Sequence, residues 1–237
     1  MSEPVEIWEI GFEDAAAVDW QVLDRRETAA ADAFIHADDR YRYGLIHTAL
    51  RLRLSELLDI VPGAVPITVG PHGRPFVADR SAEIDFNLSH SRRTGLIAIS
   101  RAGAVGVDVE DRDDTADYSD MIDTIFEPHE AACLHRLERS VRNDLFLRGW
   151  TRKEAVAKAV GTGFLLDPKL FRVPLDDCGS WSVSVRSAVT PRLALIDLSS
   201  DARAAAVAGA GLQSRPRVRR FRFERPIRAR SGTTRSF

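Results

Sequence analysis

Val105-Gly-Val-Asp-Val-Glu110 is the stretch of sequence from which the fold can be argued outward. Valine occupies every second position, and side chains alternate between the two faces of a β-strand. The valines therefore lie on one face of the strand, while Asp108 and Glu110 lie together on the other. The stretch predicts a strand that opens the second half of the chain near Ala104 and carries two neighbouring carboxylates.

Two carboxylates placed this way repel each other unless a cation or a proton lies between them. Oxygen ligands on a rigid strand suit Mg²⁺, which fills its remaining positions with water and substrate phosphate. The pattern has another interpretation, a strand with one solvated face that ends in the acidic turn of residues 111–117, and alone it favours that interpretation. A metal site at Asp108 and Glu110 therefore needs support from other residues.

The elements on either side of this strand predict two halves of the same kind. Periodicity and turn residues predict helices at 19–34, 38–58, 117–125, 128–137 and 143–160, and strands at 5–10, 67–69, 84–88, 96–100, 171–173, 181–185 and 193–198. Each half combines helices with a small antiparallel sheet. We predict an α+β fold of two halves with a similar layout, residues 1–103 and residues 104–214, with a basic tail at 215–237.

Composition excludes several other classes of protein. The chain of 237 residues is 44% hydrophobic, which is enough to bury a core without a disulfide. Cys133 and Cys178 match no metal-ligand spacing, so we expect them to be reduced in a cytoplasmic protein. The acidic start at residues 1–9 is unlike a signal peptide, and the apolar run at 204–212 is too short to span a bilayer. We expect neither export nor a membrane.

The tail carries a charge opposite to that of the rest of the chain. It holds nine arginines against one glutamate, although the whole chain has a net charge of −2. An arginine-rich segment can bind nucleic acid or an acidic protein. The interpretation we favour is a solvated, disordered end without a catalytic role.

A third carboxylate lies on the predicted helix at 143–160. Trp150, Glu154 and Lys158 are four residues apart and form one stripe, which the tryptophan turns toward the core. Glu154 and Lys158 could equally be a surface ion pair. Only three of the 33 basic residues are lysines, however, and Lys153 and Lys158 both lie close to Glu154, where a compact charge could reach a phosphate oxygen.

Phe86-Asn-Leu-Ser-His-Ser91 ends a predicted strand with small polar groups and an imidazole, which can donate hydrogen bonds to phosphate oxygens. Ser89 and His90 do not form a hydrolase pair, because adjacent strand residues point to opposite faces. A histidine at a strand end is more often structural. Arg74 lies in the tight turn Gly73-Arg-Pro75, where an ordinary solvated charge is the alternative.

Together and in order, these segments resemble the signature of the phosphopantetheinyl transferase superfamily, in its larger, monomeric Sfp-type branch. The family pattern G-[KR]-P, F-N-[IL]-S-H-[ST], G-[IV]-D-[IV]-E, F-[ST]-x-x-E and W-[ST]-x-K-E-[AS]-x-x-K with G-x-G is found at residues 73–75, 86–91, 106–110, 126–130, 150–158 and 161–163. Glu127 departs from the pattern. Singly the motifs are weak, and jointly they are highly specific.

The resemblance implies a reaction and a metal. The two halves would be fused copies related by a pseudo-two-fold, with coenzyme A between them. Coenzyme A would give its 4′-phosphopantetheine group to a serine of an apo acyl or peptidyl carrier protein, releasing adenosine 3′,5′-bisphosphate. Mg²⁺, which Mn²⁺ could replace, would be held against the pyrophosphate by Asp108, Glu110 and Glu154. Lys158 would sit by the pyrophosphate and stabilise the leaving group. Glu154 is our first choice as the base that takes the serine proton, although the identity of the base stays open.

The resemblance also implies which residues contact coenzyme A. Arg74, Ser89 and His90 would contact its nucleotide end and phosphates. Arg42 lines up with a basic residue that faces the adenine-side phosphate, and Lys153 would be a supporting charge.

Two other functions are consistent with the same residues. A metal-dependent phosphodiesterase or nuclease would also use three carboxylates, a lysine and a basic tail, and it would cleave nucleic acid without coenzyme A. A noncatalytic binding module would lack a ligand residue, and none is missing. We favour the transferase and expect a cytoplasmic monomer that does not bind nucleic acid. The sequence does not say which carrier proteins are modified or whether acylated coenzyme A is accepted.

Overall fold

The computed structural model describes residues 5–13, 18–161, 166–175, 180–183 and 193–223. Within them the helices are α1 (Arg25–Asp32), α2 (Ala37–Leu58), α3 (Ser119–Ile125), α4 (Pro128–His135) and α5 (Arg139–Val160). The strands are β1 (Val5–Gly11), β2 (Ile67–Val69), β3 (Pro75–Val77), β4 (Asp85–His90), β5 (Thr94–Ser100), β6 (Val105–Asp111), β7 (Ser180–Val183), β8 (Leu193–Asp197), β9 (Arg203–Gly209) and β10 (Val218–Arg220).

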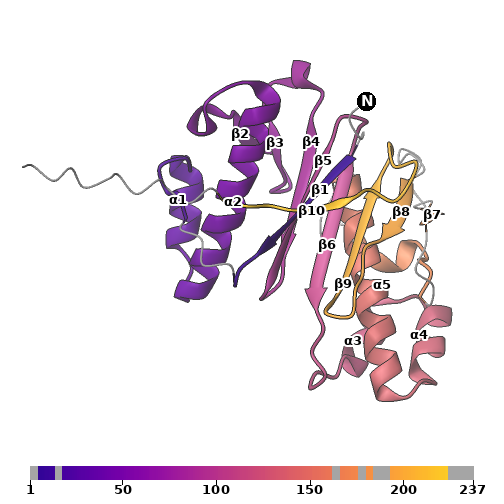
Figure 1. Cartoon of the computed structure of the whole chain (residues 1–237). Helices are drawn as coiled ribbons and strands as arrows, with labels where there is room; N and C mark the ends of the chain where they lie inside the picture. Colours follow the sequence, from indigo (N-terminus) through magenta and orange to yellow (C-terminus); the bar gives the residue numbers. More distant parts are fainter. Residues whose placement is uncertain (1–4, 14–17, 162–165, 176–179, 184–192, 224–237) are drawn as a thin grey trace, which may run out of the picture.

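Two four-stranded sheets lie at the centre of the molecule, and helices cover their outer faces (Figure 1). The first sheet has the strand order β10-β1-β5-β4, and the second has the order β6-β9-β8-β7. Neighbouring strands are antiparallel except for β10, which runs parallel to β1. β2 and β3 form a separate antiparallel pair. The predicted α+β fold of helices on small sheets is confirmed.

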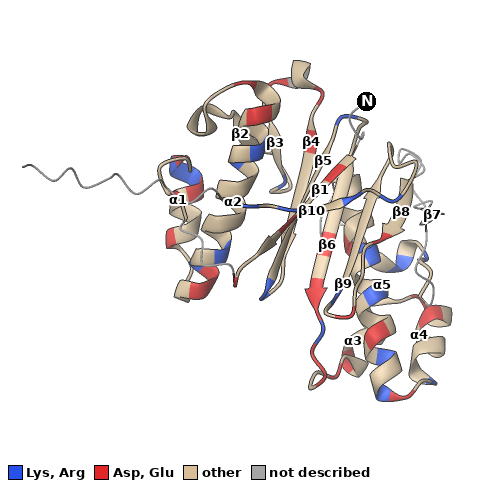
Figure 2. Ribbon diagram, viewed as in Figure 1, with Lys and Arg blue, Asp and Glu red and all other residues tan. Residues whose placement is uncertain are grey.

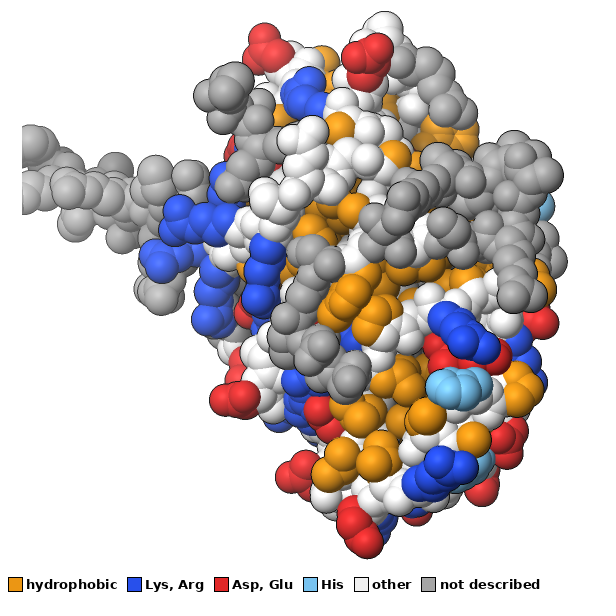
Figure 3. Space-filling view, turned by 90° about the vertical axis from the view of Figure 1, so that its right-hand side faces the viewer, with side chains coloured by type: hydrophobic (Ala, Val, Ile, Leu, Met, Phe, Trp, Pro, Cys, Tyr) orange, Lys and Arg blue, Asp and Glu red, His pale blue; other side chains and the backbone are white. Residues whose placement is uncertain are grey.

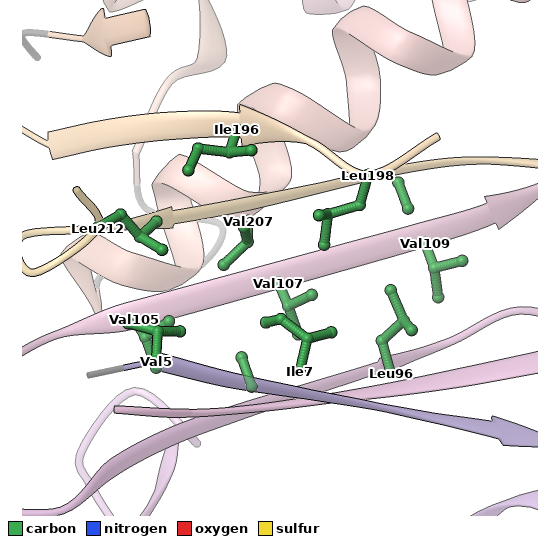
Figure 4. Packing of buried hydrophobic residues seen from close by; sticks show 12 residues of the cluster. Val5, Ile7, Leu96, Val105, Val107, Val109, Ile196, Leu198, Val207 and Leu212 are labelled. Carbon is green, nitrogen blue, oxygen red and sulfur yellow. The ribbon is translucent and has the colours of Figure 1, made fainter. Parts of the chain in front are cut away.

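The inner faces of the two sheets share one buried hydrophobic cluster (Figure 4). Val105, Val107 and Val109 contribute the side chains of β6 to this cluster. Ile7 of β1 and Leu96 of β5 contribute from the opposite sheet, and both are fully buried. Each such side chain contributes about 1.5 to 3 kcal/mol by leaving water. The valines of β6 therefore face the other sheet, which leaves its even-numbered residues to face α5.

Each outer face is covered by a 22-residue helix. Leu45, Ile46 and Leu50 of α2 pack with Ile97 and Ile99 of β5 in the first half. In the second half, α5 packs on the outer faces of β6 and β9, where alanines at 204, 206 and 208 are fully buried. These small side chains let the helix approach the sheet closely.

Several element boundaries differ from the predicted ones for local reasons. The helix expected at 19–34 begins at Arg25, because Asp24 caps it and forms a capping box with Glu27. α5 begins at Arg139, four residues before the predicted start. The strand predicted at 171–173 is wrong, since this backbone is irregular, although Phe171 and Val173 are buried. Residues 184 and 185 of another predicted strand lie outside the described residues.

Three of the described strands were missed, β3, β9 and β10, and the last of them corrects the prediction for the tail. β9 lies in the alanine-rich run at 204–212, and alanine has a low propensity for strands. β10 lies in the segment predicted to be a solvated tail, yet it pairs with β1, and Phe221 packs against Trp8. Figure 1 shows this segment crossing from the second half to the first sheet. Residues 215–223 are therefore part of the fold.

Charged residues lie on most elements, with acidic residues on β6 and both acidic and basic residues on α5 (Figure 2). On the face of the second half, hydrophobic side chains lie among charged ones and histidines (Figure 3). Among the described helices, none combines the length and the hydrophobicity that a membrane crossing requires.

Candidate active site

Gly106 allows α5 to lie directly on β6. A Cβ atom at this position would overlap the carbonyl oxygen of Ala155 and the amide nitrogen of Ala159, and it would lie 3.0 Å from the carbonyl carbon of Lys158. All three atoms belong to the helix backbone, so a side chain at 106 could be accommodated only if the helix moved. The glycine therefore sets the distance between the carboxylates of β6 and the stripe of α5 that faces them.

Asp108 is the centre of this contact. It is only 4% exposed, and its Oδ1 accepts hydrogen bonds from Ser89 Oγ at 2.7 Å and from Lys158 Nζ at 2.6 Å. The Lys158 ammonium also donates to the Val107 carbonyl at 3.3 Å. Oδ2 of Asp108 is inaccessible to solvent and has no hydrogen-bond partner in the described part of the chain. The carboxylate thus has one occupied and one unsatisfied oxygen.

Glu110 and Glu154 lie close enough to Asp108 to sense its charge. Burial and, to a lesser extent, the negative charge of Asp108 raise the pKa of Glu110 to about 7, although a hydrogen bond from Trp150 and the Lys158 ammonium act in the opposite direction. Burial and Asp108 likewise raise the pKa of Glu154, against the effect of Lys158. The three predicted carboxylates and Lys158 are thus brought together, and their repulsion favours a bound cation.

A row of polar side chains on β4 holds β6 in place. Asp85 Oδ2 accepts a hydrogen bond from the Val105 amide at 2.8 Å, and Asn87 Oδ1 accepts one from the Val107 amide at 2.9 Å. Ser89 continues the row to Asp108. These contacts satisfy amide groups on the free edge of a sheet, which would otherwise be costly to bury. The sequence analysis missed the roles of Asp85 and Asn87. Polar residues at alternate positions of this strand could have indicated that one of its faces contacts polar groups.

Positively charged groups from both halves surround the end of β4. Desolvation lowers the pKa of His90, and the charges of Arg42, His47 and Lys158 lower it further. The Arg42 side chain is held by the Arg92 carbonyl at 3.0 Å and by an ion pair with Asp39. A cluster of cations beside carboxylates is an arrangement suited to an anion with its own metal ion.

Arg74 ties the β2-β3 turn to both halves. Its guanidinium donates to Asp85 Oδ2 at 2.6 Å, to the Val105 carbonyl at 2.8 Å and to the main-chain carbonyl of Lys158. The same side chain lines a hollow between the halves, whose walls include Gly161 at the end of α5. Arg74 is therefore placed beside Lys158, with its donors already engaged by the protein.

Lys153 does not join this group. It is 1% exposed, and its ammonium lies 2.9 Å from Glu130 Oε2 and 2.8 Å from the carbonyls of Pro168 and Phe171. Burial lowers the pKa of Lys153, and the charge of Glu130 partly offsets this. The structure places Lys153 in the core between α5 and the segment that follows it, with a structural role.

Comparisons with known proteins point to one family. The family model of the 4′-phosphopantetheinyl transferase superfamily matches residues 104–208. The 4′-phosphopantetheinyl transferase HetI of Nostoc sp. is 31% identical over 225 residues, which cover 90% of this chain and 91% of HetI. The chain belongs to the 4′-phosphopantetheinyl transferase superfamily.

Two further relatives match shorter parts of this superfamily member. A Synechocystis protein that is provisionally named a 4′-phosphopantetheinyl transferase is 35% identical over 143 residues, 60% of this chain and 58% of that protein. The 4′-phosphopantetheinyl transferase AcpT of Escherichia coli K12 is 32% identical over 111 residues, 47% of this chain and 55% of AcpT. The chain therefore spans less than two thirds of the length of these two relatives.

The residues of this transferase family member fit a hard divalent cation. Within the described residues, no three His, Cys, Asp or Glu side chains are gathered closely enough to hold a metal ion as they stand. Asp108 nevertheless has an unsatisfied Oδ2, and the pKa values of Glu110 and Glu154 are raised. These carboxylates offer only oxygen donors, and a divalent cation would stabilise their charged forms. Asp108, Glu110 and Glu154 would supply the ligands.

Proposed function

We propose that this chain transfers the 4′-phosphopantetheine group of coenzyme A to a serine of an apo carrier protein, with Mg²⁺ held by Asp108, Glu110 and Glu154. The products are the modified carrier and adenosine 3′,5′-bisphosphate. Membership of the superfamily supports the reaction class, because the relatives are named as 4′-phosphopantetheinyl transferases. The carboxylates of the site support the metal, and the donor and the second product are those that the resemblance to the family implies.

The observation that carries the proposal is the state of the Asp108 carboxylate. One of its oxygens binds the Lys158 ammonium, and the other is buried without a partner in the described part of the chain. A buried, incompletely satisfied carboxylate beside a cation is costly for stability alone. It suits a site that receives a metal ion and a phosphate group, which is what a pyrophosphate substrate with Mg²⁺ provides.

The cations around β4 and α5 would hold the substrate. Lys158 can donate from its ammonium to oxygens of the pyrophosphate, and its partly exposed side chain leaves it room to do so. His90, whose pKa is lowered, is neutral at pH 7 and can donate a hydrogen bond to a phosphate oxygen. Arg42 and Arg74 would contact the nucleotide end by exchanging protein acceptors for phosphate oxygens.

The chemical step is a displacement at the phosphorus that carries the pantetheine arm. The serine oxygen of the carrier forms the new phosphorus–oxygen bond, and the bond to the bridging oxygen breaks, so that the electron pair leaves with adenosine 3′,5′-bisphosphate. Mg²⁺ bound at the site would polarise the attacked phosphorus and offset charge on the leaving oxygen. Lys158 stabilises the same leaving group with its positive charge.

Glu154 is the residue we assign to the serine proton. Burial and the charge of Asp108 raise its pKa in the metal-free protein, and the carboxylate lies on the side of α5 that faces Asp108. Glu110 has a raised pKa as well, but a hydrogen bond from Trp150 occupies its carboxylate. No such hydrogen bond engages the Glu154 carboxylate in the described part of the chain, so Glu154 is the better candidate to accept a proton.

The test is incubation with coenzyme A, Mg²⁺ and a panel of apo carrier proteins from fatty-acid, polyketide and nonribosomal-peptide assembly. Intact mass should show the addition of one phosphopantetheine group to at least one carrier. A carrier with the acceptor serine replaced by alanine is the matched control and should gain no mass. If no carrier is modified and the chain cleaves nucleic acid without coenzyme A, the alternative of a metal-dependent nuclease replaces the proposal.

A further inference from the structure

Lys158 and a divalent cation would need the same carboxylate. The Lys158 ammonium lies 2.6 Å from Asp108 Oδ1, and Ser89 donates to the same oxygen at 2.7 Å. A carboxylate oxygen offers two lone pairs, so these two donors occupy Oδ1. The remaining oxygen, Oδ2, is closed to solvent. A metal ion bound at Oδ2, which has no partner in the described part of the chain, would lie beside the Lys158 ammonium on Oδ1.

The contact that can change is that of Lys158. Its side chain is 25% exposed, whereas Ser89 is buried at 8% exposure. The backbone of Lys158 is held in place, because Arg74 donates to its main-chain carbonyl and α5 lies directly on Gly106. Four flexible methylene groups separate this fixed backbone from the charged ammonium. The ammonium can therefore move while the helix stays in place.

An ammonium and a divalent cation on one carboxylate also repel each other. Both would lie within a few ångströms in a partly buried site, where screening by water is weak. Phosphate oxygens offer the ammonium another partner of opposite charge. An anionic substrate would thus draw Lys158 away from Asp108 and leave the carboxylate to the metal ion.

We propose that the Lys158 ammonium competes with the metal ion for Asp108, so that coenzyme A and the metal ion bind cooperatively. The proposal rests on the proposed function for its second ligand. Metal binding to the protein alone is weak because Lys158 occupies the carboxylate, and coenzyme A strengthens it by engaging Lys158. By linkage, the metal ion strengthens the binding of coenzyme A by the same factor. Because of this coupling, the site binds a metal ion tightly only when coenzyme A has engaged Lys158.

The experiment measures Mn²⁺ affinity from the electron paramagnetic resonance signal of free Mn²⁺. Without coenzyme A, Lys158→Gln should bind Mn²⁺ about tenfold more tightly than the wild type, which is within the usual range of coupling between ligands. Lys158→Arg keeps the positive charge and should bind as weakly as the wild type. Lys169→Gln makes the same change at an exposed lysine and should leave the affinity unchanged.

A second arm adds coenzyme A. The wild type should then gain about tenfold more in Mn²⁺ affinity than Lys158→Gln, because only the wild type also has the ammonium drawn away from Asp108. Equal affinity of Lys158→Gln and the wild type in the first arm would overturn the competition, and so would a wild-type affinity that coenzyme A does not change although it binds. Tight Mn²⁺ binding by Lys158→Gln that survives a further Asp108→Asn change would overturn it too. Failure of coenzyme A to bind any of these proteins would instead overturn the proposed function.

Discussion

Gly106→Ala is the substitution for which the structure gives the most definite prediction. The added Cβ would overlap backbone atoms of Ala155 and Ala159 in α5. Because carbon atoms pack at about 3.5 Å, the helix has to retreat from β6 by about 1 Å. Overpacking of this kind costs about 1 to 3 kcal/mol of the free energy of unfolding. A shift of about 1 Å between reacting groups can reduce a rate about 100-fold, so transfer should fall more than stability.

The assay combines urea unfolding with the transfer rate to an apo carrier protein under conditions where the variant is folded. Gly63→Ala is the matched control, because the nearest atom to its added Cβ is Gln21 O at 3.8 Å, an ordinary contact. The control should change stability by less than about 0.5 kcal/mol and leave the rate unchanged. If Gly106→Ala unfolds at the same urea concentration and keeps its rate, the close approach of α5 to β6 does not set the geometry of the site.

Two further substitutions and one truncation test other parts of the account. Because the pKa of Glu110 is raised from 4.5 to about 7, the folded state binds its proton more tightly than the unfolded chain, and stability should fall as pH rises through this range. In urea unfolding without divalent metal, the free energy of unfolding of Glu110→Gln should therefore exceed that of the wild type by at most about 3 kcal/mol at about pH 8. The two values should match near pH 4, and a difference that does not depend on pH would contradict this. Lys153→Met should lower the free energy of unfolding by about 3 kcal/mol, because it leaves buried Glu130 without its cation. The transfer rate per folded molecule should change little. A loss of rate without a loss of stability would show that Lys153 contributes to the substrate site. A chain that ends at Ser214 should melt about 5 °C or more below one that ends at Phe223, because only the second has β10 on β1, and equal melting temperatures would show that this pairing does not stabilise the fold.

The parts of the fold that could be predicted are those where local chemistry and tertiary structure agree. The alternation at residues 105–110 predicts a strand with two distinct faces, and the structure confirms that the valines face one way and Asp108 the other. Gly161 ends α5 in the left-handed conformation expected for a glycine at that position. β9 could not be predicted, because its alanines are selected by the closeness of α5 and not by strand propensity. β10 could not be predicted either, since its pairing joins opposite ends of the chain.

In the candidate site, too, local sequence patterns predict some residues and tertiary structure decides the others. The spacing of Glu154 and Lys158 places both on the side of α5 that faces Asp108, as the stripe predicts. Lys153 is five residues from Lys158, and at 3.6 residues per turn this places it well round the helix, against Glu130. Proximity in sequence was therefore a poor guide to proximity in space. The partners on β4 depend on how two sheet edges meet, which no local pattern specifies.

Asp108→Ala tests the central claim most directly, because Asp108 contacts Ser89 and Lys158 and is the carboxylate whose charge raises the pKa of both glutamates. The measurement is the rate of phosphopantetheine transfer from coenzyme A to an apo carrier serine at saturating Mg²⁺, for the wild type and for a variant shown to be folded. The account predicts transfer by the wild type that a chelator abolishes and a loss of about 1,000-fold in the variant. Transfer by Asp108→Ala at a rate close to that of the wild type would contradict it.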